Sequence, residues 1–158
     1  MQPNQFSIRA ATSSDAHAIW DVHTRSIRQV ASRDYTPVQL AGWSDHLTAE
    51  GYVSAMEQGE VMFVAILDDK VIGFSSVKGA SIMAVYVAPD GIGFGVGKAL
   101  YQKLEAHAVA IGVAQLELDS SITAVGFYQK LGYTEISRKV HVTGSGAELP
   151  CVRMLKRL

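Results

Sequence analysis

The sequence predicts an α/β fold with a mixed, mostly antiparallel sheet of about six to seven strands flanked by helices. Three short apolar runs follow one another between Val61 and Pro89, with only tight turns between them, as in an antiparallel meander. Stretches with apolar residues at helical spacing precede and follow this region. Glycines gather in one segment, from Gly91 to Gly97. Strands and helices do not alternate, which excludes a Rossmann arrangement.

Length and composition indicate one globular domain over residues 1–158. Hydrophobic residues make up 48% of the chain and charged residues 18%, which is too apolar for a disordered protein. A net charge of -1 excludes a broad basic surface for nucleic acid or an anionic membrane. We see neither a signal-peptide pattern nor an apolar run near the ~20 residues of a membrane helix. With a single cysteine, Cys151, we expect a cytoplasmic protein without nucleic-acid or membrane partners.

The first 60 residues predict one strand and three helices. Gln5 to Ala10 reads as the strand, and Thr12 with Asp15 has capping-box spacing for the first helix. His23 and Ser26 interrupt the apolar stripe of that helix, which comprises Ile19, Val22, Ile27 and Val30. Two further helices are expected, one after Pro37 through Leu40 and Trp43, the other from about Thr48 to Glu57.

The meander and the region after the glycines complete the expected elements. The strands of the meander are Val61 to Leu67, Val71 to Val77 and Ser81 to Val87. The next helix has the clearest periodicity, with Gly112 placed to end it and a stripe formed by Val96, Leu100, Leu104, Ala108 and Ile111. A strand at Gln115 to Asp119, a helix from Ser121 to Gly132, and strands near Tyr133 to Val142 and Glu148 to Leu155 follow.

The glycine-rich segment is suited to hold phosphate. It connects a strand to the first turn of an amphipathic helix, where free backbone N–H groups and the positive end of the helix dipole coincide. Neither the dinucleotide fingerprint nor the Walker loop fits, because Val96, Lys98, Ile92 and Ala99 stand where those motifs require other residues. Taken alone, the segment reads equally well as a flexible turn.

Two linked motifs resemble the GNAT superfamily of N-acetyltransferases, as in its bacterial subfamilies of unassigned substrate. The coenzyme A loop of that superfamily has the pattern [RQ]xxGx[GA], in which Gly95 and Gly97 fill the small positions and Ile92 replaces Arg or Gln. The second motif, AxxFYxxxGF, is matched in order by Ala124, Phe127, Tyr128, Gly132 and Tyr133. The resemblance implies a GNAT-like sheet in which a splayed strand pair, Met83 to Val87 beside Gln115 to Leu118, forms the cofactor cleft.

The resemblance also implies an acetyl-CoA-dependent acyltransferase in which an amine attacks the thioester directly, in a ternary complex. Tyr128 would protonate the departing thiolate, a transfer that the basicity of a phenol allows. Acetyl-CoA, as co-substrate, would contact Val85, Val87, Ile92, Gly93, Phe94, Gly95, Val96, Gly97, Lys98, Ser121 and Phe127.

The acceptor is less well defined. His23, Ser26, Tyr35 and Trp43 lie in the region that covers the acceptor cleft in this superfamily, although each also reads as an ordinary core residue. His23, Asp119 and a chain of waters are alternatives for the group that takes the amine proton. The acceptor is a small-molecule amine, or an amino-terminal or lysine amine of a protein.

Three competing interpretations stay open at this point. The chain could be a coenzyme A-binding module without catalysis, a protein-modifying acetyltransferase, or an unrelated nucleotide-binding enzyme; Tyr128 disfavours the first and the failed fingerprints the last. The histidines show no metal-ligand spacing, so no metal site is expected. Edge strands near the carboxyl terminus suggest a homodimer.

Overall fold

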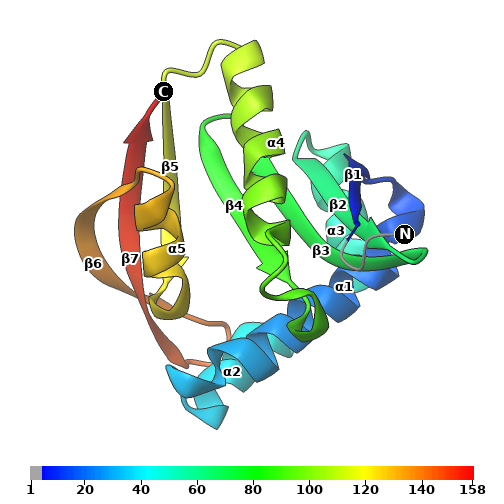
Figure 1. Ribbon diagram of the computed structural model, residues 1–158. Helices are drawn as coiled ribbons and strands as arrows, with labels where there is room; N and C mark the ends of the chain where they lie inside the picture. Colours follow the sequence, from blue (N-terminus) through cyan, green and yellow to red (C-terminus); the bar gives the residue numbers. More distant parts are fainter. Residues whose placement is uncertain (1–4) are drawn as a thin grey trace.

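The computed structural model describes residues 5–158, within which seven strands form one sheet in the order β1-β2-β3-β4-β5-β7-β6 (Figure 1). Neighbouring strands are antiparallel except β4 and β5, which run parallel. The mixed, mostly antiparallel sheet predicted from the sequence is therefore confirmed. The strands are β1 Ser7–Ala10, β2 Val61–Leu67, β3 Lys70–Lys78, β4 Ser81–Val87, β5 Gln115–Ser121, β6 Thr134–Val142 and β7 Glu148–Arg157.

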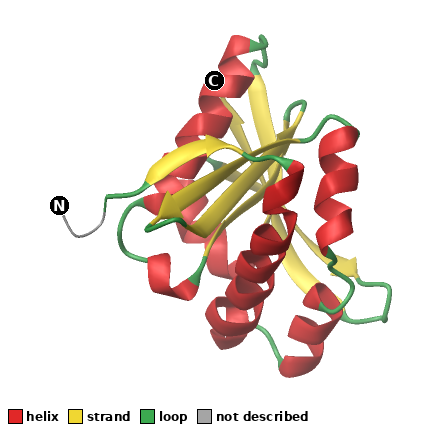
Figure 2. Cartoon of the chain, turned by 90° about the vertical axis from the view of Figure 1, so that its right-hand side faces the viewer, coloured by secondary structure: helices red, strands yellow, loops and turns green. Residues whose placement is uncertain are grey.

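Helices cover both faces of the sheet (Figure 2). Alternation along β2 divides the core, since Val64 packs with α1 and α3 whereas its neighbour Ala65 packs with α4. On β3 the register shift opposite Ala65 and Ile66 places Phe74 in the first cluster and Ile72 in the second. Within residues 5–158 no helix combines the length and apolar character needed to cross a membrane. The α-helices are α1 Ala16–Arg25, α2 Pro37–Ser44, α3 Ala49–Glu57, α4 Val96–Ala110 and α5 Val125–Lys130.

The predicted helix signals are confirmed at most ends. Asp15 Oδ2 accepts from the Thr12 amide at 2.8 Å, completing the capping box before α1. Several predicted boundaries differ by one or a few residues, and β5, for example, extends to Ser121 rather than to Asp119. The first strand begins at Ser7 rather than at residue 5. Ile111 does not belong to the buried stripe of α4: it is 56% exposed, because the helix ends at Ala110.

The chain after α1 departs from a regular helix. Ser26–Val30 form a π-helical turn, and Ala31–Arg33 form a 3-10 turn before α2. The wider turn brings Ile27 and Ala31 into one apolar cluster with Tyr35, Leu40 and Leu149. π-helical turns often accompany functional sites. We call the segment from residue 26 to residue 44 the cap.

The parallel strands β4 and β5 meet at one end only. Ser81 pairs with Glu117, and the Glu117 amide donates to the Ala80 carbonyl at 3.0 Å. No further register pair joins the two strands within the described residues. The predicted splay is therefore present, but on β5 the separated residues follow Glu117, whereas the prediction placed them from Gln115 to Leu118.

Candidate functional site

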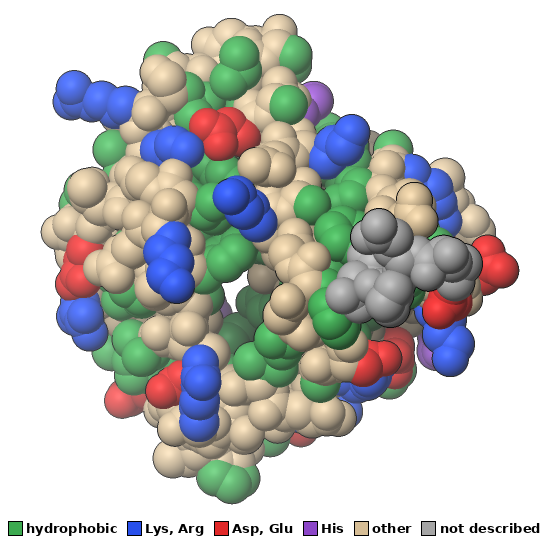
Figure 3. Space-filling model, viewed as in Figure 1, with side chains coloured by type: hydrophobic (Ala, Val, Ile, Leu, Met, Phe, Trp, Pro, Cys, Tyr) green, Lys and Arg blue, Asp and Glu red, His purple; other side chains and the backbone are tan. Residues whose placement is uncertain are grey.

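A cleft with a volume of about 390 Å³ lies where β4 and β5 separate. Figure 3 shows the surface hollowed near the centre of this face. Four segments far apart in the sequence supply its walls: the cap, the carboxyl end of β4, the glycine loop with the start of α4, and the β5–α5 connection. The lining residues are Ser26, Ile27, Val30, Ala31, Arg33, Trp43, Val85, Tyr86, Val87, Gly91, Ile92, Gly93, Gly95, Val96, Gly97, Lys98, Ser121, Thr123, Ala124 and Phe127.

The glycine loop needs its glycines for two different reasons. Gly93 and Gly95 have φ of 94° and 78°, a conformation that other residues rarely adopt. At Gly97 a Cβ atom would lie 3.2 Å from Phe127 Cε1, so a side chain there would press into the cleft wall. The first α4 turn adds N–H groups without intrahelical partners. These features fit a pyrophosphate held by backbone groups.

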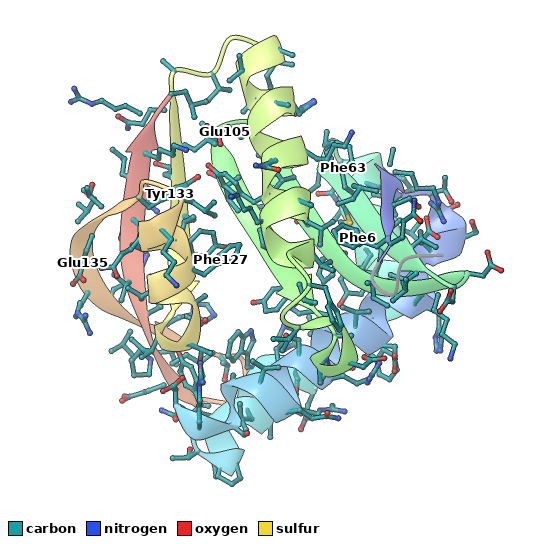
Figure 4. All side chains as sticks on the ribbon, viewed as in Figure 1. Phe6, Phe63, Glu105, Phe127, Tyr133 and Glu135 are labelled. Carbon is teal, nitrogen blue, oxygen red and sulfur yellow. The ribbon has the colours of Figure 1, made fainter. Side chains whose placement is uncertain are left out.

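The β5–α5 connection forms the side of the cleft that faces the glycine loop. Ser121 Oγ accepts from the Ala124 amide at 3.3 Å, which starts this turn as the sequence predicts. Phe127 projects from α5 into the space between α5 and β4 (Figure 4). Its ring also packs edge-on against Tyr128, with centroids 5.1 Å apart. The aromatic pair thus joins the cleft wall to the core behind it.

Tyr128 lies behind this wall and not among the lining residues. Its side chain is 6% exposed and packs with Tyr133, ring centroids 5.5 Å apart. Burial raises the pKa of Tyr128, and the nearby Tyr86 phenol raises it further. The hydroxyl is therefore protonated at neutral pH. Tyr86 itself lines the cleft.

The cap wall carries two of the four predicted acceptor residues. Ser26 and Trp43 line the cleft. Tyr35 does not; its hydroxyl donates to the Pro150 carbonyl at 2.6 Å and accepts from the Ile122 amide at 2.9 Å. This buried phenol ties the cap to β7 and to the β5–α5 connection.

His23 lies beneath the cleft floor. Its Nδ1 is 2.8 Å from the Tyr52 hydroxyl, and its ring packs on Tyr86 with centroids 4.3 Å apart. Burial lowers the pKa of His23 to about 3, and His46 contributes in the same direction. The imidazole is therefore neutral at physiological pH, and it packs on Tyr86, which lines the cleft.

Two other expected contacts also lie off the cleft. Phe94 is 41% exposed and does not line the cavity. Asp119 is paired with Lys139 at 3.2 Å and with Arg153 at 3.4 Å. No Asp or Glu appears among the lining residues, whereas Arg33 and Lys98 do. Within the described part of the chain, the cleft is thus lined by cationic side chains without carboxylates.

Sequence reasoning missed Tyr86, Arg33 and Thr123, all of which line the cleft. Tyr86 alternates with the predicted Val85 and Val87 on β4, and the splay lets both faces of that strand contribute. Arg33 follows the π-helical turn, which has no sequence signal that we could read. Thr123 lies in the connection that Ser121 caps, two residues from that predicted contact.

Curated relatives are acetyltransferases. The L-methionine sulfoximine/L-methionine sulfone acetyltransferase of Pseudomonas paraeruginosa is 30% identical over 149 residues, covering 87% of this chain and 85% of the relative. The peptidyl-lysine N-acetyltransferase YjaB of Salmonella typhimurium is 30% identical over 95 residues. That match covers 60% of this chain and spans only 63% of the length of YjaB.

Solved structures share the fold over the whole chain. A GCN5-related N-acetyltransferase from Rhodopseudomonas palustris superposes with a TM-score of 0.91 at 31% identity, covering 100% of this chain and 99% of the other. The PaiA N-acetyltransferase of Thermoplasma acidophilum, solved in complex with coenzyme A, has a TM-score of 0.75 at 20% identity, covering 98% and 99%. The second likeness concerns the fold alone.

The match to a family model adds the decisive comparison. Residues 31–157 fit the acetyltransferase (GNAT) domain, a region that holds the glycine loop, the splayed strands and α5. With the relatives, this match supports an acetyl-CoA-dependent N-acetyltransferase, as the sequence motifs indicated. The chain belongs to the GNAT acetyltransferase family.

Proposed function

We propose that this protein transfers the acetyl group of acetyl-CoA to the amine of a small molecule by direct attack in a ternary complex. The carrying observation is that the glycine loop and the cap line the same cleft of about 390 Å³. A donor held by the loop and an acceptor held by the cap would meet there. The relative named for L-methionine sulfoximine and L-methionine sulfone supports a small acceptor.

The glycine loop and β4 would hold the donor. The glycine loop, with Gly93 and Gly95 in the left-handed conformation, and the unpartnered N–H groups of the first α4 turn would hold the pyrophosphate. The separated end of β4, at Val85 and Val87, offers backbone groups to the pantetheine amides in the manner of a further strand. When bound, acetyl-CoA supplies an acyl group activated as a thioester.

Tyr128 would donate the proton that the leaving sulfur requires. Burial keeps the phenol protonated, because its pKa is raised above the ordinary value of a tyrosine. A group that must enter the reaction protonated is suited to general acid catalysis. Tyr128 touches the cleft wall through Phe127, so its hydroxyl would have to reach the sulfur past that ring.

Water would take the proton from the attacking amine. His23 is a poor base, because an imidazole with a pKa of about 3 cannot hold a proton at neutral pH. Asp119 is engaged by Lys139 and Arg153 and does not line the cleft. Of the three groups considered from the sequence, a chain of waters therefore fits best.

The test is an acceptor screen with purified protein and acetyl-CoA, in which release of the coenzyme A thiol is measured. Small amines, including amino acids and their sulfone and sulfoximine derivatives, are compared with peptides that carry one lysine or a free amino terminus. Turnover confined to small amines supports the proposal. Turnover confined to peptides would replace it by protein acetylation, the alternative that the relative named as a peptidyl-lysine acetyltransferase favours.

The same proposal includes one cytoplasmic domain that forms a homodimer. The edge strand β6 supports the dimer, since every residue of it is exposed and Ile136, Val140 and Val142 are 58%, 53% and 59% accessible. Light scattering on a size-exclusion column measures the mass. A monomer at micromolar concentration would contradict this part of the proposal and leave the activity untouched.

A further inference from the structure

Ile92 leaves the glycine loop without a polar side chain for phosphate. The superfamily pattern has Arg or Gln at this position, whereas Ile92 lines the cleft with 52% of its surface exposed. Backbone N–H groups and Lys98, at the start of α4, would then face the negative charges of the donor. Another cation that lines the same cleft would replace the missing contact.

The segment from the end of α1 to α2 carries three arginines, and two of them are already engaged. Arg25 pairs with Asp90 at 3.1 Å and with Asp21 at 3.3 Å, which ties α1 to the start of the glycine loop. Arg28 donates to Ser44 Oγ at 3.2 Å and pairs with Asp45 at 3.4 Å. Neither of these arginines lines the cleft.

Arg33 differs from both. It lines the cleft, and its side chain is 74% exposed. Its ion pair with Asp34 is long, 3.5 Å, and uses Nε, so that the two terminal nitrogens stay available. Asp34 Oδ2 also accepts from the Thr123 hydroxyl at 2.7 Å. This bond holds the base of Arg33 beside the β5–α5 connection, across the cleft from the glycine loop.

We propose that Arg33 binds a phosphate group of coenzyme A, so that the cap supplies the cationic contact that Ile92 does not. The fork of a guanidinium suits phosphate oxygens, and the one carboxylate paired with Arg33, that of Asp34, lies at Nε and does not line the cleft. The inference depends on the proposed use of acetyl-CoA as the donor. It adds that the wall that covers the acceptor also holds the donor.

The experiment is calorimetric titration of the acceptor-free protein with coenzyme A. Arg33→Gln should weaken binding by about 10- to 100-fold, the range for a lost charge-assisted hydrogen bond, and Arg33→Lys should recover part of that loss. Arg28→Gln is the matched control, since it removes a neighbouring arginine that does not line the cleft. Ile92→Arg in the Arg33→Gln protein should restore affinity. Thermal midpoints without ligand verify that each variant folds.

A second titration, with dephospho-coenzyme A, identifies the phosphate. If the Arg33→Gln loss disappears with this ligand, Arg33 binds the 3′-phosphate; if the loss persists, it binds the pyrophosphate. Equal affinity of wild type and Arg33→Gln for coenzyme A, within twofold, would overturn the inference. Failure of the wild type to bind coenzyme A would instead contradict the proposed donor itself, and the two failures are therefore distinguishable.

Discussion

On one side of the cleft the chain presents backbone, and on the other it presents side chains. The loop wall depends on Gly93, Gly95 and Gly97, whose contribution is conformation and space. The cap wall depends on the side chains of Ser26 and Trp43, which offer a hydroxyl group and a large aromatic surface to the cleft. A wall built from backbone is suited to a donor that never changes. Side chains such as Ser26 and Trp43 can be adapted to a particular acceptor, and Arg33 is the cap residue that we assign to the donor.

Tyr128 lies behind Phe127, in the wall formed by the β5–α5 connection. Its substitution should have the largest effect, because it is the residue proposed to take part in the chemical step. Tyr128→Phe should lower kcat by about 100-fold or more, because the general acid is lost while the ring still packs. Steady-state kinetics with saturating acetyl-CoA measures this. Tyr133→Phe, which loses only the 3.1 Å hydroxyl contact to Tyr101, should keep kcat. Equal kcat for wild type and Tyr128→Phe would remove Tyr128 from the mechanism.

The second largest effect should come from a side chain added to the glycine-loop wall of the cleft. Gly97→Val should weaken coenzyme A binding by roughly 10- to 100-fold, because its Cβ would already lie 3.2 Å from Phe127 Cε1 and overpacking costs about 1–3 kcal/mol. Calorimetric titration gives the dissociation constant. Gly126→Ala, where an added Cβ meets nothing within 4 Å, should bind normally. Normal binding by Gly97→Val would show that donor recognition does not depend on this wall.

A change in the cap wall should affect KM for the acceptor rather than the dissociation constant for coenzyme A. Trp43→Ala should raise KM for the acceptor by about 10-fold, since burial of a large ring against a ligand is worth a few kcal/mol at most. The affinity for coenzyme A should stay the same. Val38→Ala serves as the control, because Val38 is on α2 but 73% exposed and does not line the cleft. A change confined to coenzyme A affinity would reverse the assignment of the two walls.

The smallest effect concerns the floor of the cleft. His23 has a folded pKa of about 3, below its ordinary value near 6.5, so the unfolded chain binds the extra proton between these limits. Stability should therefore be complete above pH 6.5 and fall by at most about 1.4 kcal/mol per pH unit as the pH drops towards 3. Urea unfolding at several pH values measures this slope.

His23→Leu should flatten that part of the pH profile, whereas substitution of the exposed His141 by Gln should not alter it. A His23→Leu profile as steep as that of wild type would mean that other groups cause the acid sensitivity.

The predictions from sequence were most accurate where a signal is local. The capping box at Thr12, the glycine loop and the N-cap residue Ser121 each depend on residues a few positions apart, and each is present. The sheet order was not predicted. The insertion of β7 between β5 and β6 depends on pairing between distant segments, which no local pattern encodes.

The acceptor side was the least predictable part of the site. His23 and Tyr35, expected in the pocket, instead bond to Tyr52 and to Pro150 beneath or beside it. Arg33 and Tyr86 were not expected and line it. A polar residue on an apolar helix face has the same sequence pattern whether its partner is a ligand or another buried group.

The sequence by itself determined the family, the glycine loop and the tyrosine motif, because glycine conformation, helix starts and motif spacing are properties of short segments. The tertiary structure decided which side chains share the cleft. Residues as distant as Arg33, Tyr86 and Phe127 line it together because β5 pairs with β4 at only one end and a π-helical turn redirects the cap. Both features arise from packing between segments far apart in the chain.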